Sequence, residues 1–163
     1  MTLQIITAGR TAPNKLVCFG GADTPLDARG SRDVEALRTS VDFFGSALRC
    51  GPEAAVVQTV RLLGCEPIID DALRGLDVGR WDGLRPEDVP IEELGTWFSD
   101  PTSNPHGGET VAAFVERIST WREQCQVDVV VVAKSVAQAL LCGDIAHFFA
   151  TELRLGTRYD EGR

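Results

Sequence analysis

One lysine of this chain stands where its surroundings would change its chemistry. Lys134 comes shortly after the segment 127–132, in which five of six residues are valine. If apolar groups enclose a lysine amine, desolvation lowers its pKa. The amine can then act as a base, as a Schiff-base nucleophile or as the partner of one carboxylate. The alternative is an amine that reaches solvent along its alkyl chain and only offsets nearby acidic charge.

Polar groups in the loops are the other candidates for a site. Arg10 could bind an anion, and His106 could be a general base or a surface histidine in a Pro-Gly turn. Glu109 precedes an amphipathic helix, where an acid is usually structural because it interacts favourably with the helix dipole. Cys50 is interpreted as a buried thiol. Each of these residues has an ordinary structural explanation, so none identifies a reaction by itself.

The cysteine and histidine content argues against a metal site. The five cysteines are widely spaced, no Cys-x-x-Cys pair occurs, and the chain has two histidines. We therefore expect reduced thiols, no bound metal and no cofactor.

Charge and hydropathy exclude two classes of partner. The formal net charge is −8, with 24 acidic against 16 basic residues, so a nucleic-acid groove is not expected. No apolar run approaches the length of a membrane span and no signal peptide is recognisable, so we expect a cytoplasmic protein without a membrane partner. The expected partner is a small-molecule ligand, and a homodimer is left open.

The hydrophobic pattern alternates between strands and helices. Short strands are predicted at 3–6, 47–49, 67–70, 127–132 and, as an edge strand, 153–155. Helices are predicted from residue 31 to about 41, from 51 to a glycine stop at 64, at 91–98, from 110 onward and at 136–149. A continuous apolar strand suits the centre of a parallel sheet. The prediction is one domain, 1–163, folded as a three-layer α/β/α sandwich with a mostly parallel central sheet.

Several short motifs occur in a characteristic order. They are "IITAGRT" at 5–11, "DTPLDARG" at 23–30, "GPEAAVVQT" at 51–59, "GRWDG" at 79–83, "GGET" at 107–110 and "VVVVAKS" at 129–135. In this order and spacing the sequence resembles the histidine phosphatase superfamily, also called phosphoglycerate mutase-like, over nearly the whole chain.

The resemblance implies which groups should do the chemistry, and this chain departs from it. In that family a histidine at the end of the first strand attacks phosphorus and a second histidine follows the late strand. Two arginines bind the phosphate oxygens and an acid protonates the leaving group. The five corresponding positions hold Thr7, Ala8, Ala55, Gly75 and Lys134. Other residues implied to border the pocket are Arg10, where the family usually has an acid, Asp77, two residues after the missing acid, Trp81, His106 and Glu109.

This pattern predicts a histidine phosphatase-fold protein without phosphatase or mutase activity. In one interpretation the pocket is repurposed for non-phosphatase chemistry on a small metabolite, with Lys134 as the catalytic residue. The alternative is a catalytically dead pseudo-phosphatase that acts as a ligand-binding or scaffolding module. Because four replacements are small, we expect a wider and less polar pocket that the Lys134 side chain enters. An enclosed pocket holding Lys134 would favour the enzyme, and a filled one the module.

Overall fold

The computed structural model describes residues 2–43 and 45–161. A four-stranded sheet with the order β2-β3-β1-β4 lies at its centre. The strands are β1 (Gln4–Thr7), β2 (Leu48–Cys50), β3 (Val129–Val132) and β4 (Arg158–Asp160). β1 and β2 both pair with β3 in parallel, and β4 pairs with β1 antiparallel. The predicted α/β fold with a mostly parallel sheet is therefore confirmed.

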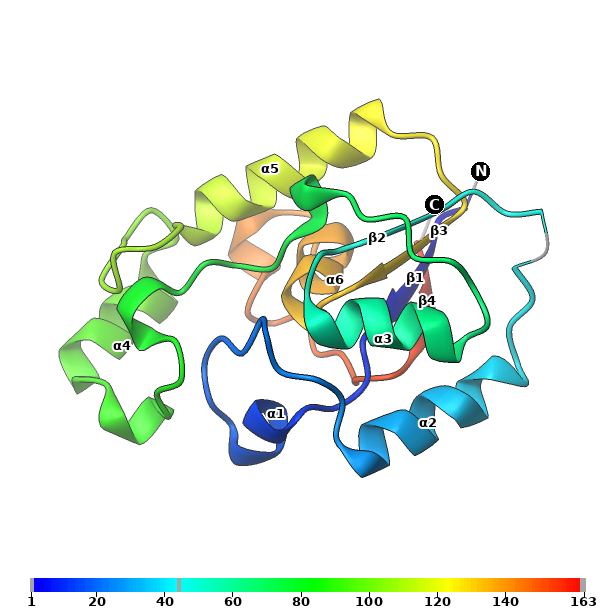
Figure 1. The fold of residues 1–163 in the computed structure, drawn as a ribbon. Coiled ribbons are helices and arrows are strands. Elements are labelled where there is room, and N and C mark those ends of the chain that lie inside the picture. Colours follow the sequence, from blue (N-terminus) through cyan, green and yellow to red (C-terminus); the bar gives the residue numbers. More distant parts are fainter. Residues whose placement is uncertain (1, 44, 162–163) are drawn as a thin grey trace.

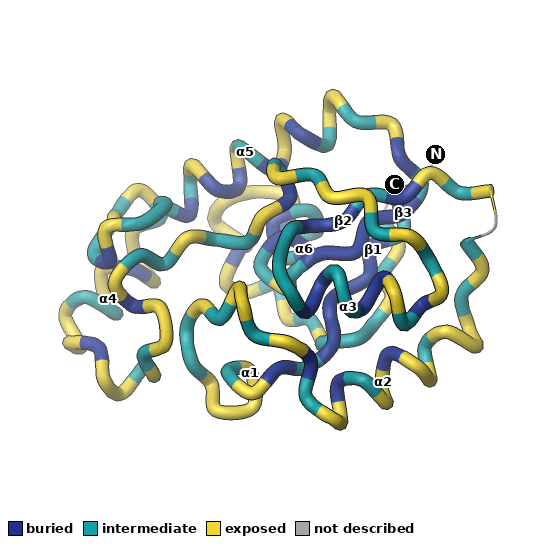
Figure 2. Tube along the Cα trace, viewed as in Figure 1, coloured by how far each residue is buried: buried dark blue, intermediate teal, exposed yellow. Residues whose placement is uncertain are grey.

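The valine run occupies the middle of the sheet, as predicted. All four residues of β3 are fully buried because the strand has neighbours on both edges and helices on both faces. A strand that never meets water gains nothing from polar alternation, which explains its continuous apolar sequence. Figure 2 shows the buried strands enclosed by partly exposed helices.

Helices cover the two faces of the sheet (Figure 1). On one face, α2 (Ala28–Arg38) and α3 (Ala54–Leu62) bury Val34, Val56 and Val60 against alternate residues of β1 and β3. On the other face, α5 (Val111–Gln124) and α6 (Lys134–Leu141) bury Phe114 and Val136 against the remaining ones. Two further helices, α1 (Ala12–Leu16) and α4 (Ile91–Ser99), lie beyond the sheet, with α4 at the far end from the two termini.

Local signals set several helix ends. The Thr110 hydroxyl caps α5 by accepting from the Ala113 amide at 3.0 Å. The predicted glycine stop after α3 is present, since Gly64 has φ +84°, a conformation that other residues adopt only with strain. None of the helices in the described part of the chain is long and apolar enough to cross a membrane.

Three predicted elements are wrong. The segment 67–70 forms only one bridge, from Ile69 to Cys50, and is not a strand. The edge strand is β4 at Arg158–Asp160 and not 153–155, because pairing with β1 selects it. The predicted helix 136–149 ends at Leu141, where Gly143 with φ +76° turns the chain before a 3-10 turn at Ile145–His147. A short helix, α1, also lies in a segment predicted to be loop.

Candidate functional site

The carboxyl ends of three parallel strands meet at one edge of the sheet. The Ala8 amide, after β1, donates to the Val132 carbonyl of β3 at 2.9 Å, and the Gly51 amide, after β2, donates to Val131 at 3.1 Å. Ligands of open α/β sheets commonly bind outside the carboxyl ends of the strands. This edge, with the first turns of α3 and α6 that follow it, is the candidate site.

The end of β1 is closed by the protein's own backbone. The Thr7 hydroxyl donates to the Arg154 carbonyl at 2.7 Å and accepts from the Thr157 amide at 3.1 Å. The Ala8 carbonyl accepts a hydrogen bond from the Gly156 amide at 2.9 Å. Thr7 is fully buried and Ala8 is 6% exposed. The C-terminal segment therefore packs against the end of β1.

The first turn of α3 is tied to the same loop. Thr59 accepts from the Gly9 amide at 3.2 Å and donates its hydroxyl to the Ala55 carbonyl at 2.7 Å. Ala55 itself is buried and offers only a methyl group. Two of the expected substrate-binding positions, 8 and 55, thus contribute shape and no polar side chain to the site.

A carboxyl group that sequence reasoning missed lies at this edge, after β2. Glu53, just before α3, accepts from the Gly75 amide through Oε1 at 2.5 Å. A Cβ placed on Gly75 would lie 3.3 Å from Glu53 Oε1 and 3.2 Å from Ser135 Oγ. The three residues come from three separate segments of the chain, and the Glu53 and Ser135 side chains both border the space that a side chain on residue 75 would occupy.

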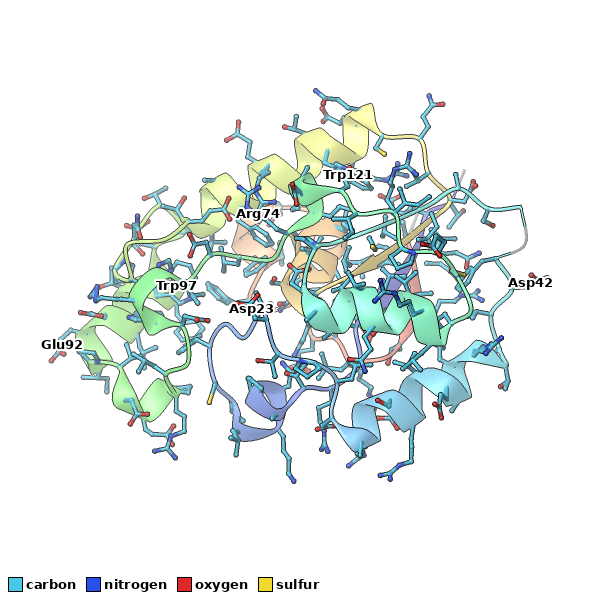
Figure 3. The ribbon with its side chains drawn as sticks, viewed as in Figure 1. Asp23, Asp42, Arg74, Glu92, Trp97 and Trp121 are labelled. Atoms are coloured by element: carbon cyan, nitrogen blue, oxygen red, sulfur yellow. The ribbon has the colours of Figure 1, made fainter. Side chains whose placement is uncertain are left out.

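The surroundings of Glu53 favour its neutral form. Burial raises the pKa of the Glu53 carboxyl, while the Gly75 amide and the more distant charge of Arg117 oppose that rise. Glu53 Oε2 is enclosed and has no hydrogen-bond partner in the structure. Figure 3 labels Asp23 and Arg74, which lie on the loops approaching this end of α3. The Ala22 carbonyl, next to Asp23, accepts from Ala54 at 3.0 Å.

Lys134 is not buried. It is the first residue of α6 and its side chain is exposed, whereas the following Ser135 accepts from the Leu76 amide at 3.3 Å. The expectation that Lys134 would enter an enclosed apolar cavity is therefore wrong, because the valine run ends at Val132 and the chain turns into α6 at the surface. Lys134 still lies at the candidate site, and its role there stays a prediction.

Arg10 is already paired within the protein. Its Nε lies 2.7 Å from Asp27 Oδ2, with both side chains largely covered. Asp27 also caps α2 through the Gly30 amide at 2.7 Å, and that bond, together with Arg10, holds the pKa of Asp27 below its usual range against the effect of burial. Arg10 thus orients the α2 cap, and anion binding by its guanidinium stays a prediction.

Trp81 and His106 belong to an aromatic cluster away from the strand ends. The His106 ring lies between Trp81 and Trp97, at centroid distances of 5.0 and 4.4 Å. Trp81 is 1% exposed and donates through Nε1 to Glu93 at 3.1 Å. His106 is also 1% exposed, so the interpretation as a surface histidine is wrong. Ligand contacts of either residue stay predictions.

The state of His106 follows from its partners. Its Nδ1 accepts from the Gly108 amide at 2.9 Å, which places the ring proton on Nε2. Burial lowers the pKa of His106, the Asp77 charge opposes that shift and the Arg80 charge adds to it. A neutral imidazole packed between indoles is suited to structural packing more than to proton transfer.

Glu109 and Asp77 also have internal partners. Glu109 forms a two-pronged ion pair with Arg117, both contacts being 3.0 Å long. Arg117 in turn donates to the carbonyls of Ala72 and Arg74 at 2.7 and 3.1 Å. Asp77 is exposed and accepts from the Gly79 amide at 2.9 Å. Glu109 thus fits the structural alternative, since it fixes the arginine that supports the segment leading to Gly75.

No enclosed cavity at the strand ends stands out among the described residues. The two best-formed hollows, of about 460 and 220 Å³, lie along α5 and open to solvent. One is lined by Trp121 and Arg117, and the other by Arg122 and Glu161. Neither hollow is lined by any of the four small residues at which a wide pocket was expected, so that pocket stays a prediction.

All five cysteines are free thiols. Cys50 and Cys142 are buried, as predicted for Cys50, and burial raises the pKa of each thiol. No group of three histidine, cysteine or acidic residues in the ranges 2–43 and 45–161 is arranged to hold a metal ion.

A family model decides the relationship of this chain to known proteins. The model for the histidine phosphatase superfamily (branch 1) matches residues 4–154. The chain belongs to that superfamily. Among solved structures, this histidine phosphatase-family chain is similar to the protein TTHB049 of Thermus thermophilus, with 22% identity and a TM-score of 0.83 over 98% of this chain and 92% of that one.

Two other similar structures are of proteins named after a function. A phosphoglycerate mutase from Thermus thermophilus shares 22% identity at a TM-score of 0.82, over 98% of this chain and 92% of that one. A putative alpha-ribazole-5'-P phosphatase of Escherichia coli shares 23% identity at a TM-score of 0.81, over 98% of this chain and 89% of that one. At these identities the likeness shows a common fold. No curated protein gives a significant match.

The two histidines of this histidine phosphatase superfamily member occupy neither position 8 nor position 134. His106 is in the aromatic cluster, and His147 is exposed in a 3-10 turn with Nδ1 2.6 Å from Asp144. Glu53, by contrast, lies at the strand-end site. The sequence shows Glu53 only as the acid of "GPE" at the start of a predicted helix, where an acid has an ordinary structural explanation in the helix dipole.

Proposed function

We propose that this histidine phosphatase-fold chain does not form a phosphohistidine and instead binds a small molecule at the carboxyl ends of its strands. The observation that carries the proposal is the content of the strand ends. Ala8 follows β1 and Lys134 begins α6, so an imidazole stands at neither position. A phosphoryl group has no nitrogen nucleophile to attack it there.

The charges at this edge also support the proposal. A phosphate dianion needs fixed positive charge around it. Of the basic groups expected at the site, Arg10 is paired with Asp27, and Lys134 is the exposed first residue of α6. The Glu53 carboxyl supplies no positive charge in either protonation state, so this edge suits a ligand other than a phosphate dianion.

A repurposed enzyme centred on Lys134 is the second candidate. The observation in its favour is that Lys134 adjoins Ser135, whose hydroxyl borders the same space at Gly75 as the Glu53 carboxyl. An amine, a hydroxyl and a carboxyl near one another could exchange protons with a ligand. We prefer the binding module, because the Lys134 amine is exposed and Thr7 and Ala8 at the end of β1 are buried. Phosphatase and mutase activity, which the names of similar structures state, are the alternatives that experiments must exclude.

The purified protein is expected not to hydrolyse phosphomonoesters. With p-nitrophenyl phosphate it should give no turnover above a buffer blank between acid and neutral pH. Incubation with the substrate followed by intact-mass spectrometry should reveal no phosphorylated protein, since Ala8 cannot accept the group. Turnover that persists through repurification and is lost in Lys134→Ala would overturn the proposal.

Lys134→Met separates ligand recognition from folding. Methionine keeps most of the length and removes the charge, and an exposed position should change the free energy of unfolding by less than about 0.5 kcal/mol. Any ligand found by a thermal-shift screen of metabolites should bind the variant at least about tenfold more weakly, because the cation at the site is gone. Lys15→Met, at another exposed lysine, is the matched control. Unchanged affinity in Lys134→Met would remove Lys134 from the site.

A further inference from the structure

The Glu53 carboxyl faces a backbone donor and a backbone acceptor of one segment. Residues 73–76, here called the strap, pass in front of it. Gly75 donates its amide to Glu53 Oε1 at 2.5 Å. Arg74, between Leu73 and Gly75, is extended with φ −62° and ψ 148°. In such a conformation the carbonyl before the residue and the amide after it point to roughly the same side, so both can meet one carboxyl group.

Glu53 Oε2 and the Leu73 carbonyl share one small space. A Cβ placed on Gly51 would lie 2.5 Å from Glu53 Oε2 and 3.0 Å from the Leu73 oxygen. Glu53 Oε2 is buried and has no partner. Two oxygens that border the same space without a hydrogen between them repel each other. A proton on Oε2 removes the repulsion, since a carboxylic acid can donate there while Oε1 accepts from Gly75.

We propose that Glu53 is a neutral carboxylic acid in the folded protein and clasps the strap through two hydrogen bonds, one accepted from Gly75 and one donated to Leu73. Loss of the proton breaks the second bond and leaves an enclosed charge beside a carbonyl. The strap therefore loosens as the pH rises.

The surrounding groups are consistent with this clasp. Burial is the main cause of the raised pKa of Glu53, and the opposing contributions are weaker. Arg117 is the cation that favours ionisation of Glu53. Its guanidinium is also bound to the Glu109 carboxylate and to the carbonyls of Ala72 and Arg74. The titratable and charged groups on the elements around Glu53 are Cys50 on β2, Glu109 just before α5, Arg117 within α5, Lys134 on α6, Arg74 on the strap, Asp71 and Asp77 on either side of the strap, and Asp23 on the neighbouring loop.

The two proposed hydrogen bonds of Glu53 affect the candidate site because the strap, residues 73–76, borders that site. The Leu76 amide donates to Ser135, which follows Lys134 in the first turn of α6. The Leu73 side chain is fully buried and anchors one end of the strap, so the loosening concerns residues 74–76. That this movement changes ligand access rests on the proposed function. The proton-dependent clasp itself does not.

Amide hydrogen exchange followed by NMR tests the clasp without any ligand. The protection factor of the Gly75 amide, corrected for the intrinsic pH dependence of exchange, reports the free energy of local opening. In the wild-type protein it should fall by up to about tenfold per pH unit above the pKa of Glu53. Glu53→Gln should keep the acid-pH protection at every pH, because its amide accepts from Gly75 and donates to Leu73. Glu53→Ala should show weak protection throughout.

Two amides provide controls within the same molecule. The Asp70 amide donates to Cys50 at 2.9 Å, just before the strap, and its protection should not follow the state of Glu53. Ser135→Ala should weaken protection of the Leu76 amide at every pH and leave the pH dependence of the Gly75 amide in place. If Glu53→Ala does not fold, the comparison of wild type with Glu53→Gln still decides.

Three results would overturn the clasp. They are a Gly75 protection factor that is independent of pH, the same pH dependence in Glu53→Gln, and an unprotected Gly75 amide in acid. The failure of the proposed function is a separate result, because a phosphorylated protein or steady phosphatase turnover would leave these exchange data unchanged. A ligand that binds equally well in wild type and Glu53→Gln at all pH values would leave the clasp intact and remove its link to ligand access.

Discussion

Replacing Trp97 by alanine should lower the free energy of unfolding by about 3–5 kcal/mol. Trp97 is 2% exposed and joins α4 to the rest of the protein through ring contacts with Trp81 and His106, at 5.8 and 4.4 Å between centroids. Figure 3 shows it on the inner side of α4. The loss of a whole indole from this cluster leaves a cavity that backbone movement can fill only in part. Urea denaturation followed by tryptophan fluorescence or circular dichroism measures the change.

The neighbouring residue provides the control. Phe98 is 57% exposed, although its ring meets Phe149 at 4.8 Å, so Phe98→Ala should cost less than about 1 kcal/mol. An equal loss of stability in both variants would mean that α4 does not depend on the indole. It would contradict the conclusion that the aromatic cluster holds α4 against the rest of the protein.

The same variant should change the pH dependence of stability through His106. Burial depresses the pKa of His106, so the unfolded chain binds its proton more readily than the folded one. The wild-type protein should therefore lose stability as the pH falls below about 6.5, the ordinary pKa of histidine. In Trp97→Ala water reaches the ring, the pKa of His106 moves back toward its ordinary value, and this loss should shrink. An unchanged slope would show that another group causes it.

Gly30→Ala should destabilise the protein by about 3 kcal/mol or more. A Cβ on Gly30 would lie 2.2 Å from the Arg10 carbonyl oxygen and 2.7 Å from the Arg10 nitrogen, and backbone atoms cannot rotate out of the way. The first turn of α2 would have to move away from the loop after β1. That movement would also strain the Asp27 cap, which holds the Gly30 amide at 2.7 Å.

Gly95→Ala is the matched substitution with the opposite expectation. Gly95 lies inside α4, is exposed, and a Cβ there meets nothing within 4 Å. Alanine should raise the free energy of unfolding by about 0.5–1 kcal/mol, since it reduces the freedom of the unfolded chain and favours the helix. Thermal unfolding of both variants measures the two effects. A tolerated Gly30→Ala would refute the close approach of α2 to the Arg10 backbone.

The sequence by itself determined those structural elements that depend only on neighbouring residues. A strand buried on both faces needs only apolar side chains, so the valines of 127–132 predicted the central strand directly. The cap at Thr110 and the glycine stop at Gly64 depend on hydrogen bonds and dihedral angles within a few residues. The family resemblance was also visible, because it depends on the order of short motifs, and the match to residues 4–154 confirmed it.

The tertiary structure decided which strand and which side chains complete the site. β4 is a strand because β1 offers it an edge, and its three residues, two of them exposed and charged, carry no such signal themselves. Lys134 is exposed because α6 begins at the surface, which the preceding valines do not reveal. Glu53 acquires its chemistry only when Gly75 and Ser135 arrive from segments 22 and 82 residues later, and His106 only when two tryptophans enclose it. Desolvation and pairing depend on all the groups around an atom, and those groups come together only in the folded chain.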